Sequence, residues 1–136
     1  MSQTQAQVSE KCWRALYWEI IRHGLLIHKS SLVAECGDVG WWLGELEVKG
    51  FVYRVNDNIY LVTMGCVDDE SARALTRLYR YIEEGVGDYC KTGVFGRCEC
   101  NKLRDVVAVL VLEVIQSVVS KCQSNILKVV EELAGI

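Results

Sequence analysis

The segment over residues 30–63 constrains the fold most, because it places two helix signals, a tight turn and a hairpin in close succession. Its first helix is predicted over residues 31–36, with Ser30 or Ser31 able to cap the helix start. The Gly-Asp pair at residues 37–38 then makes the turn, since glycine reaches backbone angles that a side chain forbids. This order of signals predicts a helix-turn-helix unit.

The second helix and the hairpin are predicted from the residues that follow this turn. Three apolar residues recur at spacings of four and three and mark the buried stripe of a second helix: Val39, Leu43 and Leu46. Gly50 ends that helix as a C-cap, with Lys49 in its last turn, where a cation suits the helix dipole. Residues 51–55 and 59–63 are rich in β-branched and aromatic side chains, and residues 56–58 supply turn chemistry, which together predict a β-hairpin.

The run Leu-Glu-Val-Lys-Gly-Phe-Val at residues 46–52 resembles the end of the recognition helix and the first wing strand of winged helix-turn-helix domains. Those domains show a leucine, three mostly polar residues, a glycine and two apolar residues at this place. The resemblance covers roughly the first half of the chain and implies such a domain over residues 1–65, with residues 25–27 as a short third strand. The expected fold class is mainly α with a small β-hairpin wing, an α+β winged helix-turn-helix followed by two C-terminal helices.

Further helices are predicted on both sides of this unit. The first runs from about residue 8 to His23, where Gly24 stops it. Its inward face carries Cys12, Leu16 and Ile20. After the hairpin, the aspartates at 68–69 can cap a helix over 70–84, which the glycines of 85–87 then break. The residues expected to face inward on that helix are Ala74 or Leu75, Leu78 and Ile82.

A long helix is predicted from residue 101 or 102 to Leu133, with an interruption near residues 123–125. Its apolar stripe consists of Val107, Val111, Val114, Val118, Cys122, Ile126, Val129 and Leu133, and its first half is apolar on nearly every side. A helix apolar on every side needs cover on every side. We therefore expect residues 66–136 to form a helical extension that ends in a dimerisation helix of a homodimer. The alternative is burial against other helices of the same chain.

The winged-helix resemblance implies a surface for double-stranded DNA. In that arrangement the helix over 39–49 faces one major-groove half-site, with the wing at residues 56–58 alongside. The residues expected to contact DNA are Gly40, Trp41, Gly44, Lys49, Arg54, Asn56, Asn58, Arg73 and Arg77. The expected function is that of a dimeric DNA-binding transcriptional regulator.

A winged helix used as a protein interaction or assembly module is the alternative. A helix that reads bases usually presents Arg, Lys, Asn or Gln. The predicted helix has no basic residue before Lys49 and carries Glu45 and Glu47. Trp41 and Trp42 are the expected anchors for a protein partner, because aromatic side chains often dominate interface energies.

Three arginines at spacings of four and three share one face of the helix after the hairpin: Arg73, Arg77 and Arg80. Such a stripe can lie along a phosphate backbone. It can equally be a solvated face that pairs with carboxylates such as Glu70 and Glu84.

The seven cysteines divide into two groups. Those inside helical patterns, expected to be buried free thiols, are Cys12, Cys36 and Cys122. Three of the others lie in the loop before the last helix, and the fourth lies at the base of the hairpin. Together they give a candidate structural zinc site of four thiolates: Cys90, Cys98, Cys100 and Cys66. A disulfide from Cys90 to Cys98 or Cys100 would close the same loop, and free thiols are the third interpretation.

Net charge and the absence of catalytic motifs argue against two classes of protein. The formal net charge is -3, and neither residues 1–65 nor residues 66–136 have a basic excess. This balance counts against a strong non-specific nucleic-acid binder, whose affinity comes mainly from phosphate neutralisation. The sequence has no nucleotide-binding glycine loop, nucleophile elbow or paired-histidine metal motif, so we do not expect an enzyme.

The expected location is the cytoplasm, as a soluble protein without membrane contact. The N-terminus is polar and has no signal-peptide core. The most apolar run, residues 106–112, is far shorter than the roughly 20 residues that span a bilayer. Disulfides are rare in a reducing cytosol, with intracellular proteins of hyperthermophiles as the known exception.

Overall fold

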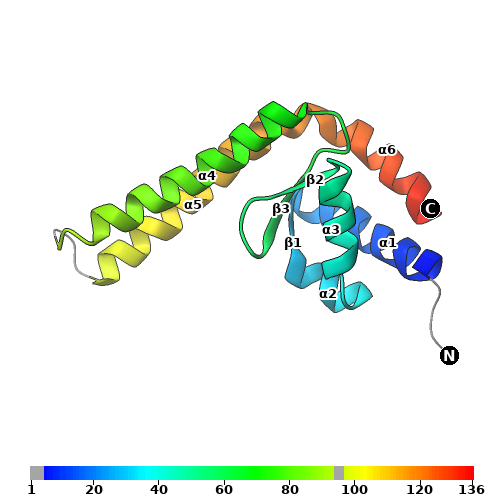
Figure 1. Cartoon of the computed structure of the whole chain (residues 1–136), viewed down its shortest axis with the longest axis horizontal. Helices are drawn as coiled ribbons and strands as arrows, with labels where there is room; N and C mark the ends of the chain where they lie inside the picture. Colours follow the sequence, from blue (N-terminus) through cyan, green and yellow to red (C-terminus); the bar gives the residue numbers. More distant parts are fainter. Residues whose placement is uncertain (1–4, 94–96) are drawn as a thin grey trace.

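The computed structural model describes the backbone of residues 5–93 and 97–136 and the side chains of residues 10–93 and 99–136. The chain is mainly helical with a small antiparallel sheet, which confirms the α+β class (Figure 1). The helices are α1 (Gln5–His23), α2 (Lys29–Cys36), α3 (Gly40–Val48), α4 (Asp69–Cys90), α5 (Arg97–Val119), the 3₁₀ helix η1 (Ser120–Cys122) and α6 (Gln123–Ala134). The strands are β1 (Leu26–His28), β2 (Val52–Arg54) and β3 (Ile59–Val62).

The sheet has the order β1-β3-β2, with β3 in the centre. Leu61 of β3 lies opposite Leu26 on one side and Tyr53 on the other, and its side chain is fully buried. The predicted third strand beside the hairpin is therefore confirmed, one residue later than expected. Asn56 closes the hairpin turn, because its Oδ1 accepts the backbone N–H of Asn58 (2.8 Å) and of Ile59 (2.7 Å).

The core lies between α1, α3, the sheet and the C-terminal helices. The predicted inward residues of the first two of these helices are all buried: Cys12, Leu16, Ile20, Val39, Leu43 and Leu46. Trp42 is also buried, with its ring 5.0 Å from that of Trp13 in an edge-to-face arrangement. The expectation that Trp42 anchors a protein partner is therefore wrong, since its side chain is part of the core.

The start of α2 differs from the prediction. The helix begins at Lys29, and its N-cap residue is His28, which makes no side-chain capping bond. Neither Ser30 nor Ser31 caps the helix. The Ser30 backbone N–H instead donates to Asn58 Oδ1 at 2.9 Å. A side chain of the hairpin turn thus accepts a backbone N–H at the start of α2, where the sequence predicted a capping serine.

Helix α4 begins as predicted but is longer. Asp68 caps it by accepting the Ser71 backbone N–H at 3.0 Å. The helix then continues through Gly85 and Gly87, where a break was predicted. Each glycine costs a helix only about 1 kcal/mol relative to alanine. The packing of α4 along the antiparallel α5 outweighs that cost (Figure 1).

The inward face of α4 also differs from the prediction. Its buried residues are Ala72, Thr76 and Tyr79, with Leu75 and Ile82 partly buried. Ala74 and Leu78 are exposed.

The long C-terminal helix is divided by η1, slightly before the predicted interruption. After this bend α6 returns to pack on α1, so the last helix lies against the first (Figure 1). Its buried residues are Ile126, Val130 and Ala134, and Arg14 Nε of α1 donates to the Ala134 carbonyl at 2.9 Å. The predicted segments 1–65 and 66–136 therefore share one packed core.

Among the described side chains, three disulfides each join two different helices, or a loop and a helix. The pairs are Cys12–Cys36, Cys66–Cys122 and Cys90–Cys100, with Cα–Cα distances of 5.3, 6.0 and 5.9 Å. They link α1 to α2, the β3–α4 loop to η1, and the end of α4 to the start of α5. The expectation that Cys12, Cys36 and Cys122 are free thiols is wrong, because each sits opposite a cysteine of another segment.

The disulfides also decide between the interpretations of the loop cysteines. Cys90 is bonded to Cys100, which is one of the two predicted pairings, and Cys66 is bonded to Cys122. The four-thiolate zinc site is therefore unsupported. The Cys98 side chain lies outside the described residues. Within the described residues, no group of three or more His, Cys, Asp or Glu side chains is arranged to hold a metal ion.

Candidate functional site: an arginine-lined groove beside α3

Four arginines line one groove of about 540 Å³ between α3, β2 and α4. Arg54 comes from the end of β2, and the others share one face of α4: Arg73, Arg77 and Arg80. The far wall consists of Glu47 and Val48 from the last turn of α3. The α4 stripe recognised in the sequence therefore faces a concave surface, with a fourth guanidinium across the groove.

Arg54 is held by an aromatic ring and a carboxylate. Its guanidinium carbon lies 5.8 Å from the centre of the Tyr60 ring, and its Nε lies 3.5 Å from Glu47 Oε1. The interaction with Tyr60, followed by that with Glu47, raises the pKa of Arg54 above its ordinary value. Glu47 Oε1 is enclosed and makes no hydrogen bond within the described residues, so Arg54 is its charge partner.

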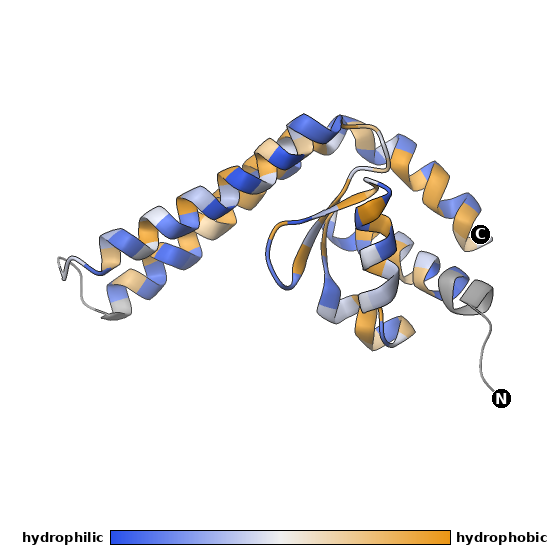
Figure 2. Ribbon diagram, viewed as in Figure 1, coloured by the Kyte–Doolittle hydropathy of each residue, from blue (hydrophilic) through white to orange (hydrophobic). Residues whose placement is uncertain are grey.

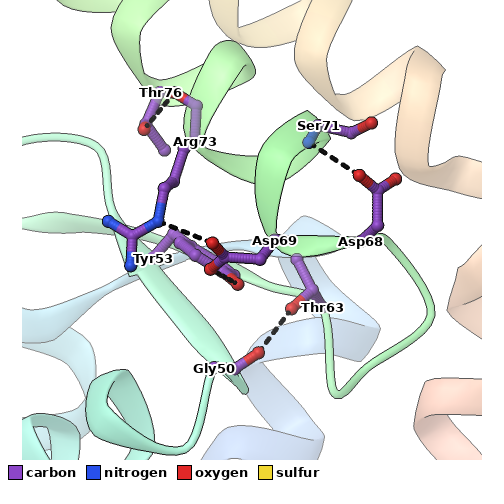
Figure 3. A network of polar contacts seen from close by, with 8 residues as sticks. All are labelled: Gly50, Tyr53, Thr63, Asp68, Asp69, Ser71, Arg73 and Thr76. Atoms are coloured by element: carbon purple, nitrogen blue, oxygen red, sulfur yellow. Dashed lines mark hydrogen bonds and ion pairs between the residues drawn. The ribbon is translucent and has the colours of Figure 1, made fainter.

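Arg73 is held by a network at the start of α4 (Figure 3). Its Nε donates to Asp69 Oδ2 at 2.9 Å, while the Tyr53 hydroxyl donates to Asp69 Oδ1 at 2.7 Å. These two hydrogen bonds, first that from Tyr53, lower the pKa of Asp69. The carboxylate thus stays ionised and fixes both Arg73 and the adjacent strand.

Arg77 and Arg80 are the least neutralised cations of the groove. Within the described residues neither forms an ion pair, and Arg80 Nη2 donates only to the Arg54 carbonyl at 3.4 Å. Four guanidinium groups thus face two carboxylates, Glu47 and Asp69. The groove has an excess of positive charge in a chain whose net charge is negative, and this arrangement suits phosphate or another anion.

A second hollow, of about 530 Å³, lies on the outer face of α3. It is lined by Trp41, Gly44, Glu45, Val48 and Lys49. Val48 is 89% exposed and lines both hollows, so the arginine-lined groove continues onto the α3 surface. This surface is partly apolar, because Trp41 is 38% exposed beside Gly44, which has no side chain.

The wing asparagines have structural partners. Asn56 Nδ2 donates to the Tyr79 hydroxyl at 3.3 Å, in addition to the turn contacts of its Oδ1. Asn58 Oδ1 accepts the Ser30 N–H, as described above. These side chains shape the wing and tie it to α2 and α4.

The structure therefore brings most of the sequence-predicted residues together, in two adjoining hollows. Arg54, Arg73 and Arg77 line the groove, and Trp41, Gly44 and Lys49 line the α3 face. Gly40 lies at the start of α3, where its N–H donates to Asp38 Oδ1. The set of expected DNA contacts lacked Glu47, Val48 and Arg80, which also line the groove, although Arg80 was part of the arginine stripe recognised in the sequence. The four-three spacing of the arginines was the available signal for Arg80.

Comparison of the chain with protein families, with characterised proteins and with solved structures finds no significant match in any of the three. Among residues 5–93 and 97–136, no helix combines the length and the apolarity that crossing a bilayer requires. The cytoplasmic location stays a prediction. Three disulfides are more typical of an oxidising compartment, or of intracellular proteins of hyperthermophiles.

Proposed function

We propose that this protein is a winged helix-turn-helix DNA-binding protein that acts as a homodimeric transcriptional regulator. The observation that supports DNA binding best is the groove beside α3 into which four arginines of β2 and α4 converge. Phosphate contacts supply nearly all of the affinity of non-specific DNA binding and a large share of that of specific binding. A groove with an excess of guanidinium groups, next to an exposed helix, provides such contacts.

The element order supports the winged-helix part of the proposal. Helices α2 and α3 are joined by a tight turn at Gly37, and the hairpin β2–β3 follows at once. Strand β1 pairs with β3 on the side away from β2. In this arrangement α3 is the recognition helix, and residues 56–58 are the wing.

In the proposed complex, the arginines position the protein on the backbone and α3 carries the base contacts. Phosphate contacts fix register but carry no sequence information. The exposed α3 surface offers Trp41 and Val48 for apolar contact, for example with thymine methyl groups, and Lys49 for a phosphate or a base edge. Two subunits would then occupy half-sites about 34 Å apart along the duplex, or a multiple of that spacing.

Fluorescence anisotropy of labelled duplex DNA at two salt concentrations tests this proposal. Wild-type protein should bind with an affinity that falls steeply as salt rises. Arg77→Glu should weaken binding by about tenfold or more and flatten the salt dependence by about one unit of slope. Lys128→Glu, on the exposed surface of α6, makes the same charge change away from the groove and is the control. Equal effects of the two variants, or absence of salt-dependent binding, would contradict the proposal.

A protein interaction module is the second candidate function. The observation that favours it is the exposed apolar surface of Trp41 and Val48, beside carboxylates that DNA would repel. In that case Trp41→Ala should abolish capture of a protein partner, whereas Arg77→Glu should have little effect. Under the DNA-binding proposal, Arg77→Glu should reduce DNA affinity more than Trp41→Ala does. The same pair of variants therefore separates the two functions.

A further inference from the structure

We infer that a second copy of this chain docks on the open face of α5, along a ridge formed by Val106, Leu110, Val114 and Val118. This inference rests on the homodimer of the proposed function and names the surface that makes it. The four side chains are between 51% and 56% exposed, although all are apolar. Within the described residues this is the longest exposed apolar row of a single helix, and Figure 2 shows hydrophobic residues recurring along α5.

The ridge is separate from the face of α5 that stabilises the monomer. In the second half of α5 the buried residues are Val111, Ile115 and Val119, each one position after a ridge residue. They belong to the core that α5 shares with α4 and the rest of the chain. Because one helix position corresponds to about 100° of rotation, the ridge points well away from that core. The fold of one chain therefore leaves the ridge uncovered.

The spacing of the ridge favours an identical partner. Its residues follow a strict i, i+4 repeat, which forms a single continuous ridge on a helix surface. Two i±4 ridges interdigitate in the commonest class of helix packing, with the helix axes crossing at about -50°. A two-fold axis makes this contact isologous, so that each ridge fills the groove beside the other. A single surface then supplies both sides of the interface.

The row of α5 beside the ridge carries an acidic and a basic residue that can pair with each other between two copies of the chain. The neighbouring row of α5 carries Val109, Glu113, Ser117 and, just beyond the helix, Lys121. Glu113 and Lys121 are both exposed, and neither forms an ion pair within the described residues. A two-fold axis between Val114 and Val118 brings Glu113 of each copy close to the partner's Lys121. The pair would therefore form twice across the interface, and this match specifies a second copy as the occupant.

Sedimentation velocity across a range of protein concentrations tests the ridge. Wild-type protein should sediment as a dimer at micromolar concentration. Leu110→Lys and Val114→Lys should raise the dimer dissociation constant by at least about tenfold. The control is Leu133→Lys on α6, an exposed apolar residue of similar accessibility (44%) away from the ridge. Circular dichroism checks that each variant is folded, as expected for substitutions at exposed positions.

Charge reversal tests the orientation of the two copies independently. Glu113→Lys and Lys121→Glu should each weaken the dimer, because each puts like charges together across the axis. The double variant should restore the wild-type dissociation constant within about threefold. A monomeric wild type overturns the inference, as does an equal loss of dimer in the Leu133→Lys control or a double variant no better than the single ones.

Failure of the proposed dimer interface can be distinguished from failure of the proposed DNA binding. A ridge variant that is monomeric should still bind DNA through its arginine-lined groove, with lower affinity because the two half-sites are no longer linked. Arg77→Glu should remain a dimer and lose DNA affinity. A wild-type dimer that binds no DNA would leave the ridge intact and contradict only the proposed function.

Discussion

Tyr53 and Asp69 are joined by a 2.7 Å hydrogen bond from the phenolic hydroxyl to Oδ1, which ties strand β2 to the first turn of α4. The other oxygen of the same carboxylate accepts from Arg73. One acidic side chain therefore sets the position of α4 against the sheet and the direction of one groove arginine (Figure 3). Burial, and then the bond to Asp69, raise the pKa of Tyr53, so its hydroxyl stays protonated as a donor.

Replacement of this carboxylate by Asp69→Asn should change how stability depends on pH. The pKa of Asp69 is lowered in the folded chain from an ordinary value of 3.8, first by Tyr53 and then by Arg73. The ionised form therefore stabilises the fold at pH values above 3.8, and this contribution is lost as the pH falls through the lowered folded value. The variant should be less stable than wild type near neutral pH, and the difference should vanish in strong acid.

Urea unfolding at several pH values measures this difference. Asp105→Asn, which removes an exposed carboxylate without a hydrogen bond in the described residues, controls for the change of net charge. A difference between Asp69→Asn and wild type that stays constant from neutral pH to about pH 2 would contradict the assigned role of Asp69.

The adjacent tryptophans of α3 should respond oppositely to truncation. Trp42 is 2% exposed and packs on Trp13, so Trp42→Ala should cost about 3–5 kcal/mol of the free energy of unfolding. Trp41 lies partly in solvent, so Trp41→Ala should cost about 1 kcal/mol or less. Thermal or chemical unfolding followed by far-ultraviolet circular dichroism gives both values. Similar costs for the two variants would mean that α3 is rotated relative to its described orientation.

The sequence was sufficient for features that depend on local chemistry. The turn at Gly37, the buried stripe through Leu43 and the hairpin all lie where the residue pattern predicts them. Asp68 caps α4 because its carboxylate reaches a neighbouring N–H, a contact that sequence order alone defines. Fold class and the small sheet could therefore be predicted.

Most features that depend on contacts between distant segments could not be predicted from the residue pattern. Cys12 and Cys36 lie in different helices, and only the packing of α1 on α2 shows that they are partners. The same holds for Trp42, whose burial depends on Trp13. The groove was predictable only in part, because the spacing of Arg73 and Arg77 shows a shared face, while the position of Arg54 across from them is a tertiary fact.

The three disulfides should stabilise the folded chain to different extents, with the largest contribution from the disulfide that closes the longest loop. The sequence separations are 56 for Cys66–Cys122, 24 for Cys12–Cys36 and 10 for Cys90–Cys100. Loop-closure entropy then predicts losses of about 4.2, 3.5 and 2.7 kcal/mol when each pair is replaced by serine or alanine. Chemical unfolding of the three double variants under oxidising conditions measures the order. A larger loss for Cys90–Cys100 than for Cys66–Cys122 would show that native-state effects outweigh loop entropy.

Two glycines with different backbone angles provide the last prediction. Gly85 lies within α4 without a positive φ, and a Cβ added there would meet nothing within 4 Å. Gly85→Ala should therefore stabilise the protein by about 1 kcal/mol, because alanine loses less backbone entropy in a helix.

Gly24 has a φ of +78°, and an added Cβ would collide with the Gln116 side chain, whose Oε1 accepts the Leu25 N–H. Gly24→Ala should therefore destabilise it, through backbone strain and displacement of Gln116. Thermal unfolding should show the Gly85 variant melting about 3 °C above wild type and the Gly24 variant below it. A Gly85 variant that melts below wild type would indicate that α4 does not continue as a helix through this position.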